Sequence, residues 1–296
     1  MRRTAAAGWF GPGSATWRIN REAALILGGG RALILQVAHP LVGAGVEHYS
    51  RFKTDRWGRL THTLDTMGQI IFGDDELAER GAARMRRAHA RIQGTVSAGH
   101  AAGRPYDATD PSLVLWVWAT LVDTSLVTYQ RYVGQLARAE IERYYEEQKR
   151  FAHACGVPVG GCPDTFGDFT VYFAQQVTDT LEPTPAARHV AEIALNPFGL
   201  PQSAAPLLAV IAAPTLGLLP PTLRDDLGLR WSPSRDLLLR LAASASRVLL
   251  PALPPRLRHV RSAREAMERT RPRARTRAEE LAGALAAGRE PPRVRV

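Results

Sequence analysis

Apolar residues recur along most of this chain at intervals of three and four, which is the period of an amphipathic helix. In 59–72, for example, apolar residues stand at 60, 64, 67, 70 and 71, and Gly73 follows as a helix-ending residue. No convincing alternating strand pattern and no repeat is found. The pattern predicts helices over 17–27, 31–37, 59–72, from 74 or 75 to about 92, from 111 through the apolar run 113–122, 138–154, 164–181, 184–195, 232–250 and 262–287. We therefore expect an all-α fold, a single-domain multi-helix bundle.

Local signals mark where several of these helices begin and end. Asp74 or Asp75 can cap one helix, Asp110 with Pro111 starts another, and Thr184 with Pro185 starts a third. The run 28–30 is three glycines, but Leu33 breaks the spacing of a dinucleotide-binding loop. We interpret these glycines as a helix break that permits close backbone packing. Between 196 and 221 proline and glycine recur, which indicates either a loose apolar segment or short helices.

The same patterns divide the chain into three parts. Residues 1–16 form a flexible N-terminal segment, 17–260 a helical domain, and 261–296 a basic C-terminal helical extension or tail. From 256 to 277 there are nine arginines and two acids. That charge suits either a solvated helix or a peripheral contact of the tail with an anionic membrane.

Composition narrows the classes of protein and partner. Hydrophobic residues at 45% and charged residues at 22% describe a soluble protein with a real core. The net charge of +10 comes almost entirely from arginine, because Lys53 and Lys149 are the only lysines. We expect no specific nucleic-acid partner. The run 113–122 is too short for a transmembrane segment, so we interpret it as a buried core helix.

The cysteines and the N-terminus indicate a compartment. Cys155 and Cys162 stand alone, without a disulfide framework or a metal-binding Cys-x-x-Cys spacing. The first residues lack the apolar region of a signal peptide. We expect a cytoplasmic protein.

The most informative residue is His89, in an arginine-rich amphipathic stretch. Met85, Ile92 and Val96 lie at i−4, i+3 and i+7 from it, so the imidazole is expected to face the interior. One interpretation is a satisfied core histidine. The other is a single axial ligand of a non-covalent haem b, with apolar walls and guanidinium groups for the propionates.

Other patterns leave few alternative chemistries. The sequence contains no His-x-x-x-His or Glu-x-x-His pair and no Gly-x-Ser-x-Gly elbow, so zincin, ferritin-like and α/β-hydrolase sites are unsupported. His39, before Pro40, is expected to hydrogen-bond a helix end and carry favourable charge there, with ligation as the alternative. Asp123 lies inside an apolar helix, where it either bonds an arginine or hydroxyl in the core or faces a cavity. Trp116 and Trp118 are expected to pack in the core.

Several segments together resemble the MpaB-like oxygenase and rubber oxygenase (latex clearing protein) family. The resemblance runs in order from about 17 to 255. It is carried by Trp-Arg-Ile-Asn-Arg-Glu (17–22), Leu-Ile-Leu-Gln-Val-Ala-His-Pro (33–40), Arg-Leu-Thr-His-Thr (59–63), Ile-Phe-Gly (71–73), Arg-Arg-Ala-His-Ala (86–90), Tyr-Asp-Ala-Thr-Asp-Pro (106–111) and Leu-Trp-Val-Trp-Ala-Thr (115–120).

The resemblance implies roles for particular residues. In rubber-cleaving members the histidine matching His89 is the proximal haem ligand, and an arginine and a threonine matching Arg59 and Thr63 lie by the haem. Those enzymes carry lysine where this chain has His62, so we do not expect efficient polyisoprene cleavage. The resemblance also implies globin-like packing around the haem.

Together these observations predict one site and two functional classes. The residues assigned to catalysis are Arg59, His62 and Thr63; those assigned to the cofactor are His89, as the iron ligand, with Met85, Arg86 and Gln93. The first class is a haem b-dependent oxygenase or oxidoreductase using O₂ on a small hydrophobic, isoprenoid-like molecule. The alternative is a non-catalytic helical protein that binds haem or lipid. The oligomeric state is left open.

Overall fold

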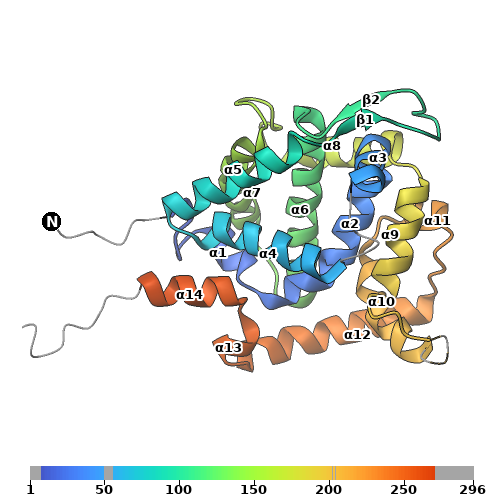
Figure 1. The fold of residues 1–296 in the computed structure, drawn as a ribbon. Helices are drawn as coiled ribbons and strands as arrows, with labels where there is room; N and C mark the ends of the chain where they lie inside the picture. The colour runs from blue at the N-terminus through green and yellow to red at the C-terminus, as the bar shows by residue number, and fades with distance from the viewer. Residues whose placement is uncertain (1–7, 50–55, 202, 204, 271–296) are drawn as a thin grey trace, which may run out of the picture.

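The computed structural model describes residues 8–49, 56–201, 203 and 205–270. Over this part the chain is mostly helical, so the all-α prediction is confirmed (Figure 1). The elements are α1 (Ala15–Asn20), η1 (Ala23–Gly28), α2 (Gly29–Ala38), α3 (Pro40–Tyr49), α4 (Arg56–Phe72), α5 (Asp75–His89), β1 (Gln93–Thr95), β2 (Pro105–Asp107), α6 (Pro111–Tyr132), α7 (Arg138–Cys155), α8 (Phe166–Gln175), η3 (Gln176–Thr180), α9 (Pro185–Leu195), α10 (Ala205–Leu218), α11 (Pro221–Asp226), α12 (Pro233–Leu249), η5 (Leu250–Ala252), α13 (Pro255–Arg258) and α14 (Arg261–Thr270).

Local capping chemistry sets the start of most predicted helices. The carboxylate of Asp74 accepts from the backbone N–H of Leu77 at 2.8 Å and starts α5. Asp110 caps α6, with Pro111 at its first position, and Thr184 caps α9 in the same way. The helix predicted over 164–181 instead begins after Thr165, whose hydroxyl accepts from the N–H of Asp168. These caps satisfy N–H groups that a helix start leaves without an intrahelical partner.

The long apolar helix α6 runs through the centre of the bundle (Figure 1). It packs against α2, α7 and η1, and α12 covers its C-terminal end. Length and hydropathy would allow α6 to cross a membrane, but 61% of its most apolar window is buried inside the protein. The indoles of Trp116 and Trp118 are buried and donate to the carbonyls of Leu35 and Gln148. Both tryptophans therefore pack in the core, as predicted.

Two of the three glycines, Gly28 and Gly30, let η1 and α2 approach their neighbours closely. A Cβ on Gly28 would lie 2.3 Å from Thr128 Oγ1 of α6, and one on Gly30 would lie 2.2 Å from Thr215 Oγ1 of α10. Real side chains do not tolerate such distances, so only glycine permits this packing. The predicted close packing is thus confirmed for Gly28 and Gly30, whereas the predicted helix break is wrong, because η1 runs directly into α2.

A buried guanidinium joins the three helices that meet there. Arg31 of α2 is almost fully buried and bonds Asp123 Oδ2 at 2.6 Å and Thr124 Oγ1 at 2.5 Å, both on α6. Its Nε donates to the carbonyl of Leu218, the last residue of α10, at 2.6 Å. The first of the two interpretations of Asp123, a bond to a core arginine, is therefore correct.

The structure differs from the sequence expectations at the N-terminal helix. The helix predicted over 17–27 is interrupted at Arg21 and Glu22, which separate α1 from η1. Glu22 is buried, accepts from Arg258 Nε at 2.8 Å, and forms a β-bridge with His259. This contact with a distant segment turns the chain out of its helix.

Other elements also escaped the periodicity argument, among them α3 and a short ribbon. Pro40 ends α2, as predicted, but it also opens α3, and the helices η1–α2 and α3 are bent by 103° to each other. A short antiparallel ribbon pairs Gln93–Thr95 with Pro105–Asp107. Its three-residue strands leave little room for an alternating pattern.

The C-terminal part of the described chain belongs to the body of the bundle. Helix α14 packs on α4, burying Ala263 and Ala266, and Arg269 donates to the carbonyl of Phe72 at 2.8 Å. The predicted boundary at 260 falls just before α14. The predicted tail beyond 270, including Pro272, lies outside the described residues, as do residues 1–7.

Replacing Asp123 with alanine should destabilise the fold by about 3 kcal/mol, because it removes the only carboxylate facing the buried Arg31 guanidinium in the described part of the chain. Urea unfolding followed by circular dichroism measures this. Glu76→Ala, which breaks the exposed Glu76–Arg80 pair, serves as the control and should cost less than about 0.5 kcal/mol. Equal effects of the two substitutions would contradict the prediction.

Candidate functional site

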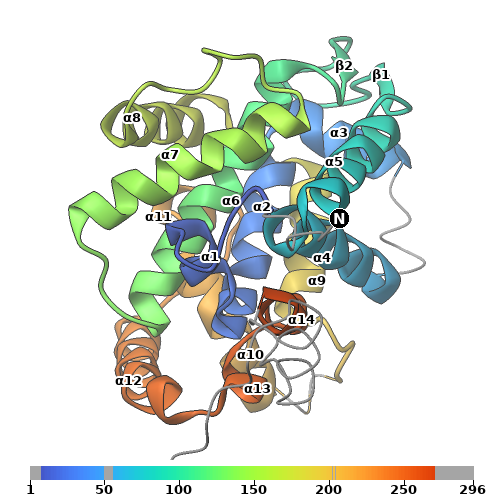
Figure 2. The same ribbon diagram turned by 90° about the vertical axis from the view of Figure 1, so that its left-hand side faces the viewer.

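Helices α4 and α5 form the antiparallel hairpin that carries most of the candidate residues (Figure 2). The hairpin closes at Gly73 and Asp74, and the helices come close where Gly81 faces Ile70: a Cβ on Gly81 would lie 3.0 Å from Ile70 Cγ1. Because the helices are antiparallel, the start of α4 and the end of α5 lie at the same end of the hairpin. The backbones of Arg59 and His89 are therefore brought to one side of the molecule.

His89 is the last residue of α5 and lies on its interior stripe. It follows the buried residues Ala78 and Ala82 by eleven and seven positions, which place all three on one helix face. The side chain is half-buried, and its Nδ1 atom is shielded from solvent. The imidazole thus continues the buried face of α5, but Ile92 and Val96, which the sequence argument also placed on this face, lie beyond the end of the helix.

The candidate residues of α4 lie on a stripe that changes from buried to exposed. Thr63 precedes the buried Thr66 and Ile70 by three and seven positions, so it continues their face toward the helix start. Thr63 itself is exposed, and so is His62. The side chain of Arg59 lies outside the described residues. A pocket shared by these residues and His89 stays a prediction.

The residues assigned beside His89 make structural contacts. Arg86 donates to the carbonyl of Ala154 at the end of α7 and to Glu79. Met85 packs against the main core, and the amide of Gln93 donates to Asp107 across the ribbon at 3.0 Å. These contacts hold the end of α5 against α7 and close the ribbon; a role of the three residues at a cofactor stays a prediction.

His39 is buried at the bend between α2 and α3, which we did not predict from the sequence. His39 packs beside Trp116, with ring centroids 6.5 Å apart, and its Nδ1 has no hydrogen-bond partner among the described residues. Burial, and then the positive charge of Arg104, lowers the pKa of His39 to about 4. The ring is therefore neutral near pH 7, so it does not carry the predicted charge at the helix end. The feature of the sequence that could have indicated this burial is the Ala-His-Pro segment at the end of an apolar helix.

Trp116 extends this aromatic contact into the core. Its ring lies 5.4 Å from that of Phe173 on α8, over which the Arg31 guanidinium sits at 5.8 Å. The bend at His39 is thus joined to the buried arginine.

The metal-ligating side chains that lie near one another limit which metal or cofactor the protein could hold. Within the described residues, no group of three or more histidine, cysteine, aspartate or glutamate side chains is placed to hold a metal ion. A surface hollow between α11 and α12, lined by residues such as Trp231 and Arg235, contains none of the candidates. A group that needs a single protein nitrogen on an interior helix face fits the placement of His89 better than a bare ion does.

Comparison with known proteins identifies the family. The chain matches the model of the ER-bound oxygenase mpaB/B'/rubber oxygenase catalytic domain over residues 16–248, and it belongs to that family. The uncharacterized proteins Mb2261 of Mycobacterium bovis and Rv2237 of Mycobacterium tuberculosis are each 28% identical to it over 213 residues, covering 69% of this chain and 80% of theirs. No solved structure matches it significantly. The matched region contains every candidate residue, and the predicted family is confirmed.

The buried His39 should make stability depend on pH. Its folded pKa is about 4, below the ordinary 6.5, so the unfolded chain binds a proton first as pH falls. The neutral ring therefore contributes about 3 kcal/mol to the free energy of unfolding above pH 6.5, and this contribution is lost as the pH falls from 6.5 to 4. His39→Gln should lose less stability than the parent over this window in urea titrations. His100→Gln, at an exposed ring, is the control and should keep the parent's profile; a parent profile in His39→Gln would refute the assignment.

Proposed function

We propose that this protein is a haem b-dependent oxygenase acting on a small hydrophobic substrate with O₂. Family membership supports the oxygenase class. The haem assignment rests on the position of His89, which lies at the end of the interior stripe of α5 with the start of α4 beside it. The substrate class rests on the resemblance to rubber-cleaving members and includes isoprenoid-like molecules.

Each candidate residue has a role that its side chain can perform. His89 would hold the haem iron through an imidazole nitrogen, and Met85 and Arg86, on the same end of α5, would provide an apolar wall and a cation for the acidic groups of the haem. Gln93 lies just beyond the helix and lines the edge of the site. Haem, when bound, supplies the oxygen and one-electron chemistry that amino-acid side chains lack.

In the proposed site, the residues of α4 contact the reacting molecule, whereas those of α5 hold the cofactor. Arg59 stabilises negative charge, while the hydroxyl of Thr63 and the imidazole of His62 donate hydrogen bonds and relay a proton. His62 stands where rubber-cleaving members have lysine. An imidazole is bulkier than an ammonium group, so the reacting group meets a different donor.

The cellular setting proposed from the sequence is the cytoplasm. Cys155 and Cys162 are both buried and unpaired, and burial raises the pKa of their thiols to about 12 and 11. Unreactive free thiols suit a reducing compartment.

Replacing His89 with alanine should abolish haem binding. The protein is expressed with haem precursors, purified, and measured for the Soret band and for iron by elemental analysis. His48→Ala is the control, because His48 is an exposed histidine that hydrogen-bonds Tyr106 and should leave haem content unchanged. Equal haem in His89→Ala and the parent would reject the assignment. A colourless, iron-free parent would instead favour the non-catalytic helical protein.

Haem-loaded protein should not cleave polyisoprene efficiently, because His62 replaces the lysine of the rubber-cleaving members. The measurement is chromatography of aldehyde- and ketone-ended fragments after incubation with polyisoprene and O₂. His62→Lys tests the reason directly: it should raise fragment yield above the parent. Rapid fragment release by the parent would show that His62 does not exclude this substrate. Lack of turnover on polyisoprene and on small isoprenoids and phenols would favour the haem-binding, non-catalytic alternative.

A further inference from the structure

Helix α12 is fixed to the bundle by one narrow face. Leu239 and Ala243 are buried there, and the hydroxyl of Ser246 donates to the carbonyl of Tyr132 at the end of α6. In Figure 1 the helix runs along the lower edge of the molecule and continues into α13. The other side of α12 is turned away from the bundle.

That outer side is aliphatic instead of polar. Five large side chains of α12 are between 52% and 75% exposed: Leu237, Leu238, Leu241, Val248 and Leu249. At 100° per residue they occupy one continuous arc of about 120°. Leu253 and Leu257 extend the exposed aliphatic side chains toward α13. We call these seven residues the α12 face. Monomeric soluble proteins rarely expose so large an apolar group without a partner.

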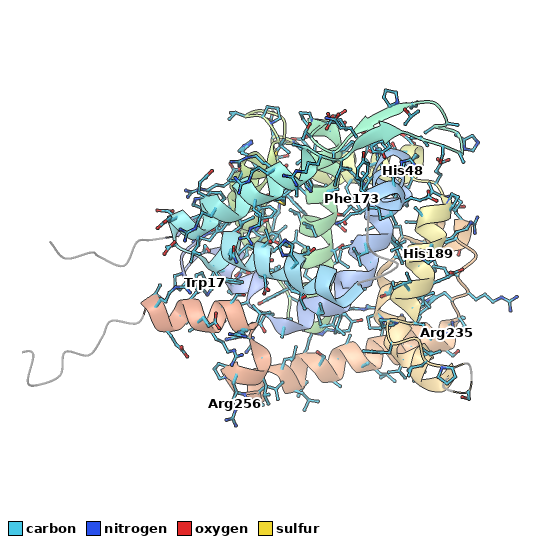
Figure 3. All side chains as sticks on the ribbon, in the orientation of Figure 1. Trp17, His48, Phe173, His189, Arg235 and Arg256 are labelled. Atoms are coloured by element: carbon cyan, nitrogen blue, oxygen red, sulfur yellow. The ribbon has the colours of Figure 1, made fainter. Side chains whose placement is uncertain are left out.

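Positive charge surrounds the α12 face. The segment 233–258 contains five arginines and one acid, Asp236. Arg240 is bonded to Asp236 at 3.0 Å and Arg258 to Glu22, so three arginines of the segment, Arg235, Arg247 and Arg256, are not matched by its acid. Figure 3 shows Arg235 and Arg256 toward the two ends of this edge. An apolar arc rimmed by cations matches the two layers of an anionic membrane surface, where acyl chains lie beneath negative headgroups.

We propose that the α12 face is a docking surface for an anionic lipid bilayer, with the leucines entering the headgroup boundary and the arginines pairing with lipid phosphates. The charge disfavours a second copy of this chain, because two such faces would oppose their arginines. The composition disfavours a protein partner, since protein interfaces are enriched in aromatic residues and the α12 face contains none. The proposal is independent of haem and differs from a contact through the tail beyond 270.

The test is flotation of the full-length protein with vesicles of phosphatidylcholine alone and of phosphatidylcholine mixed with phosphatidylserine. The parent should float with the anionic vesicles and lose binding as salt is raised. Leu238→Ser/Leu241→Ser should bind them at least about tenfold more weakly, because two aliphatic side chains no longer enter the bilayer. Arg256→Gln should also weaken binding.

Matched controls come from exposed residues on other surfaces. Val159→Ser/Val171→Ser changes two exposed apolar side chains, Val171 lying on α8, which Figure 2 places at the opposite edge from α12. Arg188→Gln changes an exposed arginine of α9. Both controls should bind as the parent does, and circular dichroism should show the same helix content in all variants.

Three outcomes would overturn the proposal: a parent that floats with neither vesicle, equal weakening by the control pair and the α12 pair, or a parent dimer that Leu238→Ser/Leu241→Ser converts to monomers. The last outcome would assign the α12 face to a second copy of the chain.

Discussion

The arrangement of the bundle depends on one buried cation, Arg31. Its guanidinium joins the side chains of Asp123 and Thr124 on α6 to the carbonyl of Leu218 at the end of α10. A charge that is almost fully buried is tolerated only while its partners stay in place, so it fixes the relative positions of α2, α6 and α10. The glycines at 28 and 30 are the steric counterpart, because they let the backbone come close enough for these bonds to form.

The fixed position of α2 determines the placement of the candidate site. Helix α2 ends at His39, where the ring packs beside Trp116 of α6 and the chain turns into α3. Helix α3 in turn contacts the ribbon, whose first strand follows directly after α5. The end of α5, with His89, is therefore held between the ribbon on one side and the Arg86 contact to α7 on the other. A histidine in this position has a defined backbone, which a ligand of a prosthetic group requires.

Features encoded within a few residues could be predicted, and features that need a distant partner could not. Asp110 and Thr184 begin their helices through side-chain bonds to N–H groups two or three residues away, so the sequence alone locates these ends. The break at Glu22 depends on Arg258, which is 236 residues away, and no local pattern reports it. The same division applies to the site. Helical spacing relates His89 to Met85 within α5, but the end of the helix at His89, before Ile92 and Val96, could not be located from periodicity. The contact of Arg86 with the carbonyl of Ala154 depends on how α5 and α7 pack.

The two halves of α4 differ in how much of their surface is buried in the bundle. Its C-terminal half is held by Thr66 and Ile70, which are buried, and by the packing of α14. Its N-terminal half continues the same face, but Thr63 is exposed and the neighbouring Leu64 is 46% exposed. The apolar side chain of Leu64 contributes little to the packed core and presents its surface to a bound molecule. A group bound by His89 and covered by this half of α4 would bury that surface only in the folded state, so binding and folding would stabilise each other. The part of α4 that folding leaves exposed is thus the part on which the proposed chemistry depends.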